Sequence, residues 1–107
     1  MTPLTEAQQA VAVAMTEKEL LALVRDAART FGYRMYHTLR SKGSEAGFPD
    51  LILLRDGVGW AIELKREGKE PTPAQHDWLY DFTAAGFRTA VWRPTDWLSG
   101  RILEELR

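Results

Sequence analysis

The sequence contains no cysteine and only two histidines, His37 and His76, and these absences exclude several kinds of site. Without thiols there are no disulfides, thiolate metal ligands or cysteine nucleophiles, and two imidazoles cannot build a histidine-rich zinc site. No apolar run approaches the roughly 18 residues that a membrane-spanning helix requires. The first residues lack the basic flank of a secretory signal, so we expect neither a membrane span nor a signal peptide.

The charge of the chain is nearly balanced, because 14 basic and 15 acidic residues give a net charge of −1. Proteins that coat nucleic acid without sequence preference are usually strongly basic, so this class is disfavoured. One stretch, residues 25–42, nevertheless carries five basic residues against one acidic residue. Such a stretch can follow a phosphate backbone, although a solvated helix face would have the same composition.

At 107 residues, the chain is expected to form a single domain around one core. We divide it into an N-terminal arm or extension, residues 1–15, and a single domain, residues 16–107. Apolar spacing predicts a helix from Thr16 to Gly32, with Thr16 and Glu19 spaced as a capping box. The other predicted elements are strands over 33–38, 50–55, 58–65 and 87–92, a helix over 72–86, and a last helical region from Pro94 to near Leu106. This order predicts an α/β fold whose last strand lies parallel to a neighbour.

The most informative charges lie on a predicted hairpin. The Asp-Gly pair at 56–57 is typical of a two-residue turn, and a turn of that length places Asp50 opposite Glu63. A four-residue loop would instead place Asp50 opposite Lys65. In either register the three side chains share one face of the sheet, because side chains alternate along a strand.

Two carboxylates that face each other across a hairpin repel, by roughly 0.2–1 kcal/mol. A divalent cation such as Mg²⁺ or Mn²⁺ would remove this repulsion, because it prefers oxygen ligands and keeps several waters. Lys65 beside such an ion suits a phosphate or an anionic transition state. The alternative interpretation is that Glu63 and Lys65 are ordinary charges on a solvent-exposed sheet face, paired with Asp50.

These charges belong to an ordered set of short motifs. The set comprises T-E at 16–17, G-F-P-D-L at 47–51, E-L-K at 63–65, T-P-A-Q at 72–75 and V-W-R-P-T-D-W at 91–97. With these motifs in this order, the chain from Thr16 to about Trp97 resembles the VRR-NUC family of the PD-(D/E)XK nuclease superfamily. The likeness is to its stand-alone form, found in phages and bacteria.

The resemblance implies a restriction-endonuclease-like fold with an αβββαβ core, a mixed central sheet flanked by helices, and an additional C-terminal helix. It implies a Mg²⁺- or Mn²⁺-dependent endonuclease that hydrolyses DNA backbone phosphodiesters. Asp50 and Glu63 would be metal ligands, together with the backbone carbonyl of Leu64. Lys65 would position or help to deprotonate the attacking water, or stabilise the charge of the transition state.

Two helix residues also match the family. Glu17 matches a first-helix glutamate that relatives use at the metal, and it continues the apolar stripe of its helix, whereas Glu19 lies off that stripe. Relatives often have glutamine where this chain has Leu21. Gln75 matches a glutamine that approaches the lysine or the water. Both have structural alternatives, because a glutamate in a first turn suits the helix dipole and Thr72 with Gln75 forms a capping box.

The loop before Asp50 holds three predicted DNA contacts, Arg40, Lys42 and Ser44, where relatives often carry serine and basic residues. The alternative is an ordinary solvated loop. His37, at the end of the first strand, could also touch DNA, although a histidine in this place more often has a structural role.

Stand-alone relatives are associated with branched DNA, including four-way junctions, and act as homodimers, so the same substrate and assembly are expected here. We expect no organic cofactor, no membrane partner, and a location in the cytoplasm of a bacterium or phage-infected cell. Two other functions remain open: a catalytically inactive nucleic-acid-binding module with a nuclease fold, and an interaction protein whose acidic cluster is structural. The intact set of Asp50, Glu63 and Lys65 favours the enzyme.

Overall fold

The computed structural model describes residues 3–39 and 45–107. Its helices are α1 (Glu6–Ala14), α2 (Glu17–Thr30), α3 (Pro73–Ala84), α4 (Pro94–Leu98) and α5 (Arg101–Leu106). Its strands are β1 (Arg34–His37), β2 (Leu51–Arg55), β3 (Val58–Leu64) and β4 (Arg88–Trp92). The predicted strands and the two predicted long helices are all present, with ends that shift by one or two residues.

The strands form one mixed sheet in the order β1-β2-β3-β4. β1, β2 and β3 pair antiparallel, whereas β4 pairs parallel with β3. The parallel pair arises because α3 forms a helical crossover that returns the chain to the same end of the sheet. The predicted mixed sheet and its parallel last strand are therefore confirmed.

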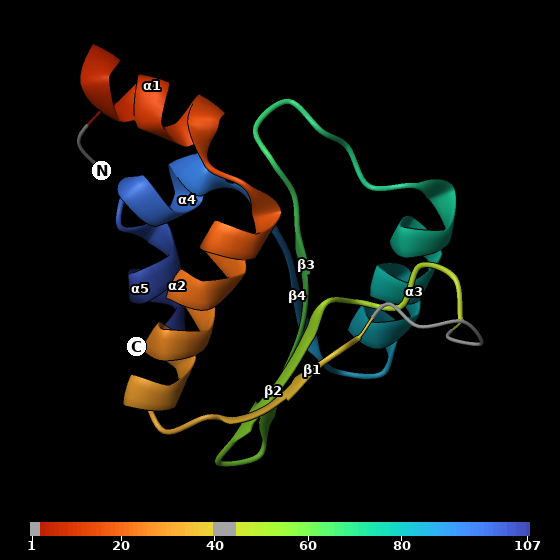
Figure 1. The fold of residues 1–107 in the computed structure, drawn as a ribbon. Helices are drawn as coiled ribbons and strands as arrows, with labels where there is room; N and C mark the ends of the chain where they lie inside the picture. Colours follow the sequence, from red (N-terminus) through yellow and green to blue (C-terminus); the bar gives the residue numbers. More distant parts are fainter. Residues whose placement is uncertain (1–2, 40–44) are drawn as a thin grey trace.

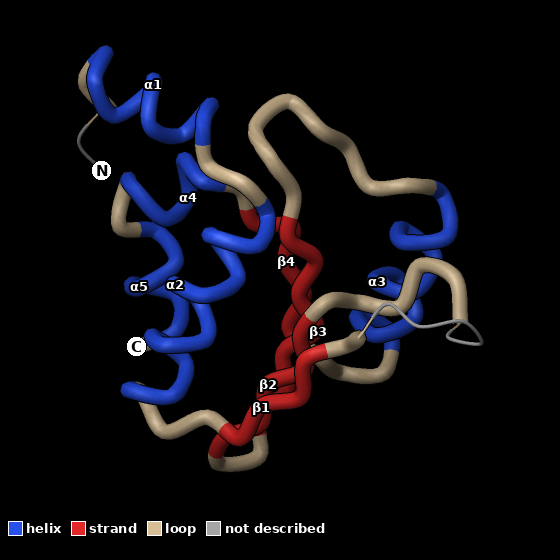
Figure 2. The backbone as a smooth tube through the Cα atoms, viewed as in Figure 1, coloured by secondary structure: helices blue, strands red, loops and turns tan. Residues whose placement is uncertain are grey.

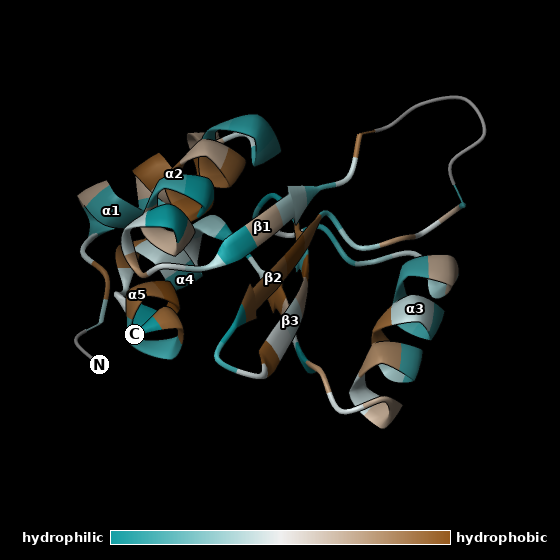
Figure 3. Ribbon diagram, turned by 90° about the horizontal axis from the view of Figure 1, so that it is seen from below, coloured by the Kyte–Doolittle hydropathy of each residue, from teal (hydrophilic) through white to brown (hydrophobic). Residues whose placement is uncertain are grey.

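Helices cover both faces of this sheet, as Figures 1 and 2 show: α3 lies on one face, and α1, α2, α4 and α5 lie on the other. The core lies on the side of α2 and α5, where Leu20, Val24 and Ile102 belong to one buried cluster with Leu53 and Trp92. Figure 3 shows the apolar colour of β2 between the two layers of helices. The observed architecture is the predicted α/β fold with helices flanking the sheet.

The hairpin between β2 and β3 has the shorter of the two possible loops. Arg55 pairs with Val58, so the residues at 56–57 alone form the turn. The last pair at the other end joins Leu51 to Ile62, which places Asp50 opposite Glu63, one step beyond the paired residues.

The two faces of β3 differ in chemistry. Trp60, Ile62 and Leu64 belong to the core on the α2 side. Because side chains alternate along a strand, Glu63 points to the opposite face, toward α3. The candidate site therefore lies on the α3 side, where β3 ends and β2 begins.

The helices near the two ends of the chain differ in detail from the predicted elements. The last helical region is divided into α4 and α5 at Gly100, whose φ of +84° does not continue an α-helix. Near the N-terminus, α1 buries Ala12 and is followed by the buried Met15, and it contacts α4. The domain boundary at residue 15 remains a prediction. Within residues 3–39 and 45–107, no helix is long and apolar enough to cross a membrane.

Candidate active site

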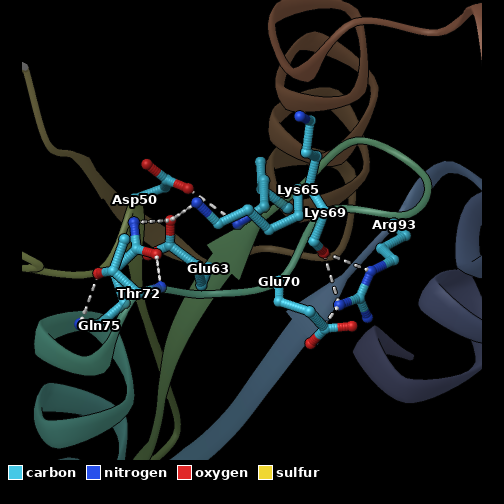
Figure 4. A network of polar contacts seen from close by, with 9 residues as sticks. Asp50, Glu63, Lys65, Lys69, Glu70, Thr72, Gln75 and Arg93 are labelled. Carbon is cyan, nitrogen blue, oxygen red and sulfur yellow. Dashed lines mark hydrogen bonds and ion pairs between the residues drawn. The ribbon is translucent and has the colours of Figure 1, made fainter.

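Asp50 lies where β2 begins, and hydrogen bonds on two sides fix its position. The Thr38 hydroxyl donates to the Pro49 carbonyl at 2.7 Å, and the Thr38 N–H donates to the Asp50 carbonyl at 2.9 Å. The Leu64 N–H donates to Oδ2 of the Asp50 carboxylate at 2.8 Å. These bonds hold the carboxylate against the end of β3 (Figure 4).

Glu63 meets two polar side chains on the α3 side of the sheet. Gln75 Nε2 donates to Glu63 Oε1 at 3.0 Å, and Lys65 Nζ lies 4.0 Å from the same oxygen. Glu63 is only 1% exposed and Lys65 only 9%. Figure 4 shows these side chains converging with Asp50. The structure therefore brings together four of the predicted residues: Asp50, Glu63, Lys65 and Gln75.

Gln75 forms the predicted capping box, and its amide nitrogen binds Glu63, whereas the family resemblance implied an approach to the lysine or the water. Its Oε1 accepts the Thr72 N–H at 2.8 Å and its own N–H donates to Thr72 Oγ1 at 3.2 Å, which completes the capping box of α3. Its Nε2 is left to bind Glu63. A residue in the first turn of α3 thus also connects this helix to the buried carboxylate.

The burial of Glu63 and Lys65 contradicts the alternative of an ordinary solvent-exposed charge pair. Withdrawing a carboxylate and an ammonium from water costs on the order of several kcal/mol per ion, and apolar residues of similar volume often give a more stable core. Stability therefore does not explain the two buried charges at the end of this otherwise apolar strand.

The segment before β2 is held against α3 by close packing. The ring of Phe48 packs edge-on against Trp78 with centroids 5.0 Å apart, and Trp78 Nε1 donates to the Ala46 carbonyl at 3.1 Å. Gly47 has a φ of +82°, and a Cβ at this position would lie 2.5 Å from the carbonyl carbon of Ala74 in α3. Glycine is therefore required here, and its contact with the first turn of α3 sets where the following aspartate lies.

Gly47→Ala is expected to destabilise the protein more than an ordinary substitution at positive φ. The methyl group would clash with α3 in addition to the cost of a left-handed residue, which is about 1–2 kcal/mol. Gly32→Ala is the matched control, because Gly32 has the same φ of +82° and no neighbour within 4 Å of an added Cβ. Urea unfolding should show a further loss of about 1–3 kcal/mol for Gly47→Ala. Equal losses in the two variants would contradict the close contact.

The two glutamates in the first turn of α2 have different surroundings. Glu19 accepts the Thr16 N–H at 3.0 Å in the capping box, and the hydrogen bonds from the Thr16 backbone and hydroxyl lower the pKa of the Glu19 carboxyl. Glu17 instead lines a pocket of about 350 Å³ together with Asp50 and Leu64. This agrees with the predicted helix phase, in which Glu17 and not Glu19 turns toward the site.

Asp50 borders a second hollow, of about 500 Å³, on the α3 side of the sheet. Lys65, Thr72 and Gln75 line this second hollow. Thr38 and Leu39 border both hollows, as Asp50 does. Asp50 thus borders both hollows, one on each side of the sheet end.

The carboxylates fit a metal ion that needs few protein ligands. Among the residues that the structure describes, no group of three His, Cys, Asp or Glu side chains has the spacing to hold a metal, so Glu17 does not complete a three-carboxylate cluster. Mg²⁺ is usually bound through one or two carboxylates and keeps several waters, and Mn²⁺ suits the same oxygen ligands. The facing pair of Asp50 and Glu63 meets that requirement.

Three predicted site residues, Arg40, Lys42 and Ser44, lie outside the described residues. Two residues that help to build the site were not singled out from the sequence. Thr38 fixes the backbone at Asp50, and Trp78 binds the loop before it. A threonine after a strand and a tryptophan one turn into a helix carry no local pattern that predicts such long-range contacts.

Comparisons with known proteins agree with this geometry. The VRR-NUC domain family matches residues 4–96 of the chain. A solved structure described as a "VRR_NUC domain protein" is 25% identical with a TM-score of 0.66, and the match covers 87% of this chain and 91% of that one. Another, described as a "VRR_NUC domain", is 26% identical with a TM-score of 0.61, covering 73% of this chain and 84% of that one. No curated protein matches the chain. The chain belongs to the VRR-NUC domain family and has its nuclease-type fold.

Proposed function

We propose that this protein is a Mg²⁺- or Mn²⁺-dependent DNA endonuclease. The observation that carries the proposal is the convergence of Asp50, Glu63 and Lys65 at one end of the sheet, with Glu63 and Lys65 buried at a cost in stability. Membership of a nuclease family supports a phosphodiester as the bond that is broken. The metal is part of the proposal because facing carboxylates repel one another in its absence.

In this proposal Asp50 and Glu63 hold the ion, and the backbone carbonyl of Leu64 completes the site. Glu17 supports the site from α2, in the pocket that Asp50 borders, without completing a three-carboxylate cluster among the described residues. Such an ion, when bound, lowers the pKa of a water and polarises a phosphoryl oxygen. The Leu64 N–H and Gln75 keep the two carboxylates in place, through hydrogen bonds of 2.8 and 3.0 Å. The ligands are thereby oriented by the protein.

Lys65 is the proposed cationic group at the reacting phosphate. The attacking water approaches the phosphorus in line with the leaving oxygen, and Lys65 positions or helps to deprotonate that water, or stabilises charge on the phosphate oxygens. Because the Lys65 side chain is only 11% exposed, water screens its interaction with that charge less than at an exposed lysine.

The proposed substrate is branched DNA such as a four-way junction, and the proposed assembly is a homodimer. A junction must be cut on two strands, and a symmetric dimer presents two equivalent sites. Arg40, Lys42 and Ser44 are the proposed contacts to the DNA backbone near the cut.

A panel of labelled DNA molecules tests this proposal. A four-way junction, a flap and a linear duplex of shared sequence are incubated with the protein in Mn²⁺, and the junction is expected to be cut fastest. Binding of all three without cleavage would instead support the catalytically inactive nucleic-acid-binding module.

The proposed homodimer has a test of its own. Light scattering should give about twice the chain mass of 12.2 kDa, and a monomer mass would contradict the dimer.

Glu17→Gln is expected to reduce cleavage or Mn²⁺ affinity by about 10–100-fold, the range found for groups that support a metal site. Glu19→Gln is the matched control in the same helix turn, because glutamine also completes a capping box. Single-turnover cleavage at several Mn²⁺ concentrations measures both variants. A larger loss for Glu19→Gln would contradict the orientation of α2 toward the site.

A further inference from the structure

The pocket on the α2 side of Asp50 contains two nitrogen donors to which the proposed chemistry assigns no role. Lys18 follows Glu17 in the first turn of α2, and His37 ends β1; both line the pocket of about 350 Å³ that Asp50 borders. His37 pairs with Leu51, a fully buried residue on the α2 side of the sheet. Because cross-strand partners share a face, the imidazole points toward α2.

Neither donor is engaged by the protein in the part of the chain that the structure describes. Lys18 is exposed and His37 half-buried, and neither side chain makes a hydrogen bond or ion pair there. Arg29, the basic residue in the last turn of the same helix, differs in this respect, because it binds Asp26 at 3.1 Å. Lys18 and His37 are therefore available to a ligand that enters the pocket.

The pocket also contains negative charges, which oppose the binding of an anionic ligand. Glu17 and Asp50 place two carboxylates on its wall, and carboxylates repel an anion. A ligand phosphate on this side therefore needs a cation or an N–H donor directed at it. Among the described residues that line the pocket, the side chains of Lys18 and His37 alone supply one. A DNA strand carries one phosphate per 3.4 Å or so of helix axis, so a phosphate at Asp50 has a neighbour close by.

We propose that Lys18 and His37 bind a DNA backbone phosphate adjacent to the scissile one, in the pocket between α2 and the end of β1. This inference rests on the proposed function, because it takes the scissile phosphate to lie at Asp50 and Lys65. Each of the two hollows that Asp50 borders then binds a different phosphate of one DNA strand. Lys65 acts at the bond that breaks, while Lys18 and His37 hold the strand beside it.

The test measures binding and cleavage separately. Affinity for a labelled four-way junction is measured in Ca²⁺ over a range of salt concentrations, and single-turnover cleavage is measured in Mn²⁺ at saturating protein. Lys18→Ala should weaken binding and reduce the salt slope by about one. His37→Ala should weaken binding by about tenfold, as expected for one hydrogen bond to a charged group. The saturated cleavage rate should change only a few-fold, because a contact to a phosphate that does not react is equally strong in ground and transition state.

Two further variants show whether the contact is specific. Lys18→Arg keeps the positive charge and should restore the salt slope. Arg29→Ala removes one positive charge from the far end of the same helix and should leave affinity nearly unchanged. Equal thermal midpoints for all variants establish that each of them folds.

Unchanged affinity and salt slope in both Lys18→Ala and His37→Ala would overturn the inference, and so would an equal loss in Arg29→Ala. If the wild-type protein binds DNA but does not cut it, the proposed function fails, and the salt slopes still decide whether this pocket binds a phosphate. If the wild-type protein cuts DNA and both variants bind as well as it does, only the inference fails. Absence of DNA binding by the wild-type protein would contradict both.

Discussion

Asp50→Asn is expected to reduce DNA cleavage by about a thousandfold or more. The substitution removes the negative charge that the proposed metal requires, and a bound metal contributes several kcal/mol of transition-state stabilisation, roughly 4 kcal/mol for a thousandfold change. Asparagine still offers an oxygen to the Leu64 N–H, so the 2.8 Å hydrogen bond that positions the side chain can be kept. Single-turnover cleavage of a four-way junction in Mn²⁺ measures the effect.

Asp50→Asn is also expected to leave the thermal stability of the metal-free protein unchanged or higher. In the absence of metal it removes one of two facing carboxylates, so the thermal midpoint should hold or rise. Asp56→Asn is the matched control, because Asp56 lies in the exposed turn at the other end of β2 and tolerates asparagine at its φ of +51°. Cleavage by Asp56→Asn should equal that of the wild-type protein. Near-wild-type turnover by Asp50→Asn would refute the assignment of Asp50.

Lys65→Ala is expected to lower the cleavage rate by about 10²–10³-fold, the cost of losing one preorganised group that stabilises the transition state. Lys65 follows Glu63 by two residues on the same face of the strand, and its Nζ lies 4.0 Å from Glu63 Oε1. An ammonium held there stabilises negative charge that grows during the reaction. Its loss should therefore lower the cleavage rate more than the affinity for DNA in the ground state. DNA affinity in Ca²⁺ should stay close to that of the wild-type protein.

Lys65→Met accompanies the alanine variant, because methionine fills most of the space that a buried lysine leaves. Both variants should lose rate and keep affinity, whereas Lys18→Ala should lose affinity and keep most of the rate. A lysine that only binds phosphate would weaken affinity and reduce the salt slope by about one. Unchanged cleavage with weakened binding in both Lys65 variants would therefore contradict the catalytic role and favour an inactive binding module.

The local structure of this chain follows closely from its sequence. The capping boxes at Thr16 and Thr72 predicted the starts of α2 and α3. The Asp-Gly pair at 56–57 predicted the hairpin and two possible registers, of which the structure has the one with the two-residue turn. These signals are short-range, since each depends on hydrogen bonds within four residues or on a single turn. The sequence predicts one helical region from Pro94 to near Leu106, because residues on both sides of Gly100 favour helix. Gly100 is the local signal for the division of this region into two helices.

The tertiary contacts of the site were less predictable. The hairpin predicted that Asp50 faces either Glu63 or Lys65, and the structure has the pairing with Glu63. The contact from Gln75 to Glu63 was not predicted, because the family resemblance implied an approach to the lysine or the water. The packing of Gly47 against Ala74 depends on where α3 crosses the sheet, which no local pattern specifies. The same holds for the position of His37 in the pocket beside Asp50, because it requires α2 and β1 to meet at one end of the sheet.

Cleavage of a labelled four-way junction by the purified wild-type protein, in Mn²⁺ and in EDTA, tests the metal-dependent nuclease most directly. Asp50→Asn in Mn²⁺ serves as the third reaction and excludes a contaminating nuclease. We expect defined products from the wild-type protein in Mn²⁺, none in EDTA, and none from Asp50→Asn. Equal cleavage in Mn²⁺ and EDTA, or no cleavage by the wild-type protein in Mn²⁺ on DNA that it binds, would contradict a metal-dependent endonuclease built on Asp50 and Glu63.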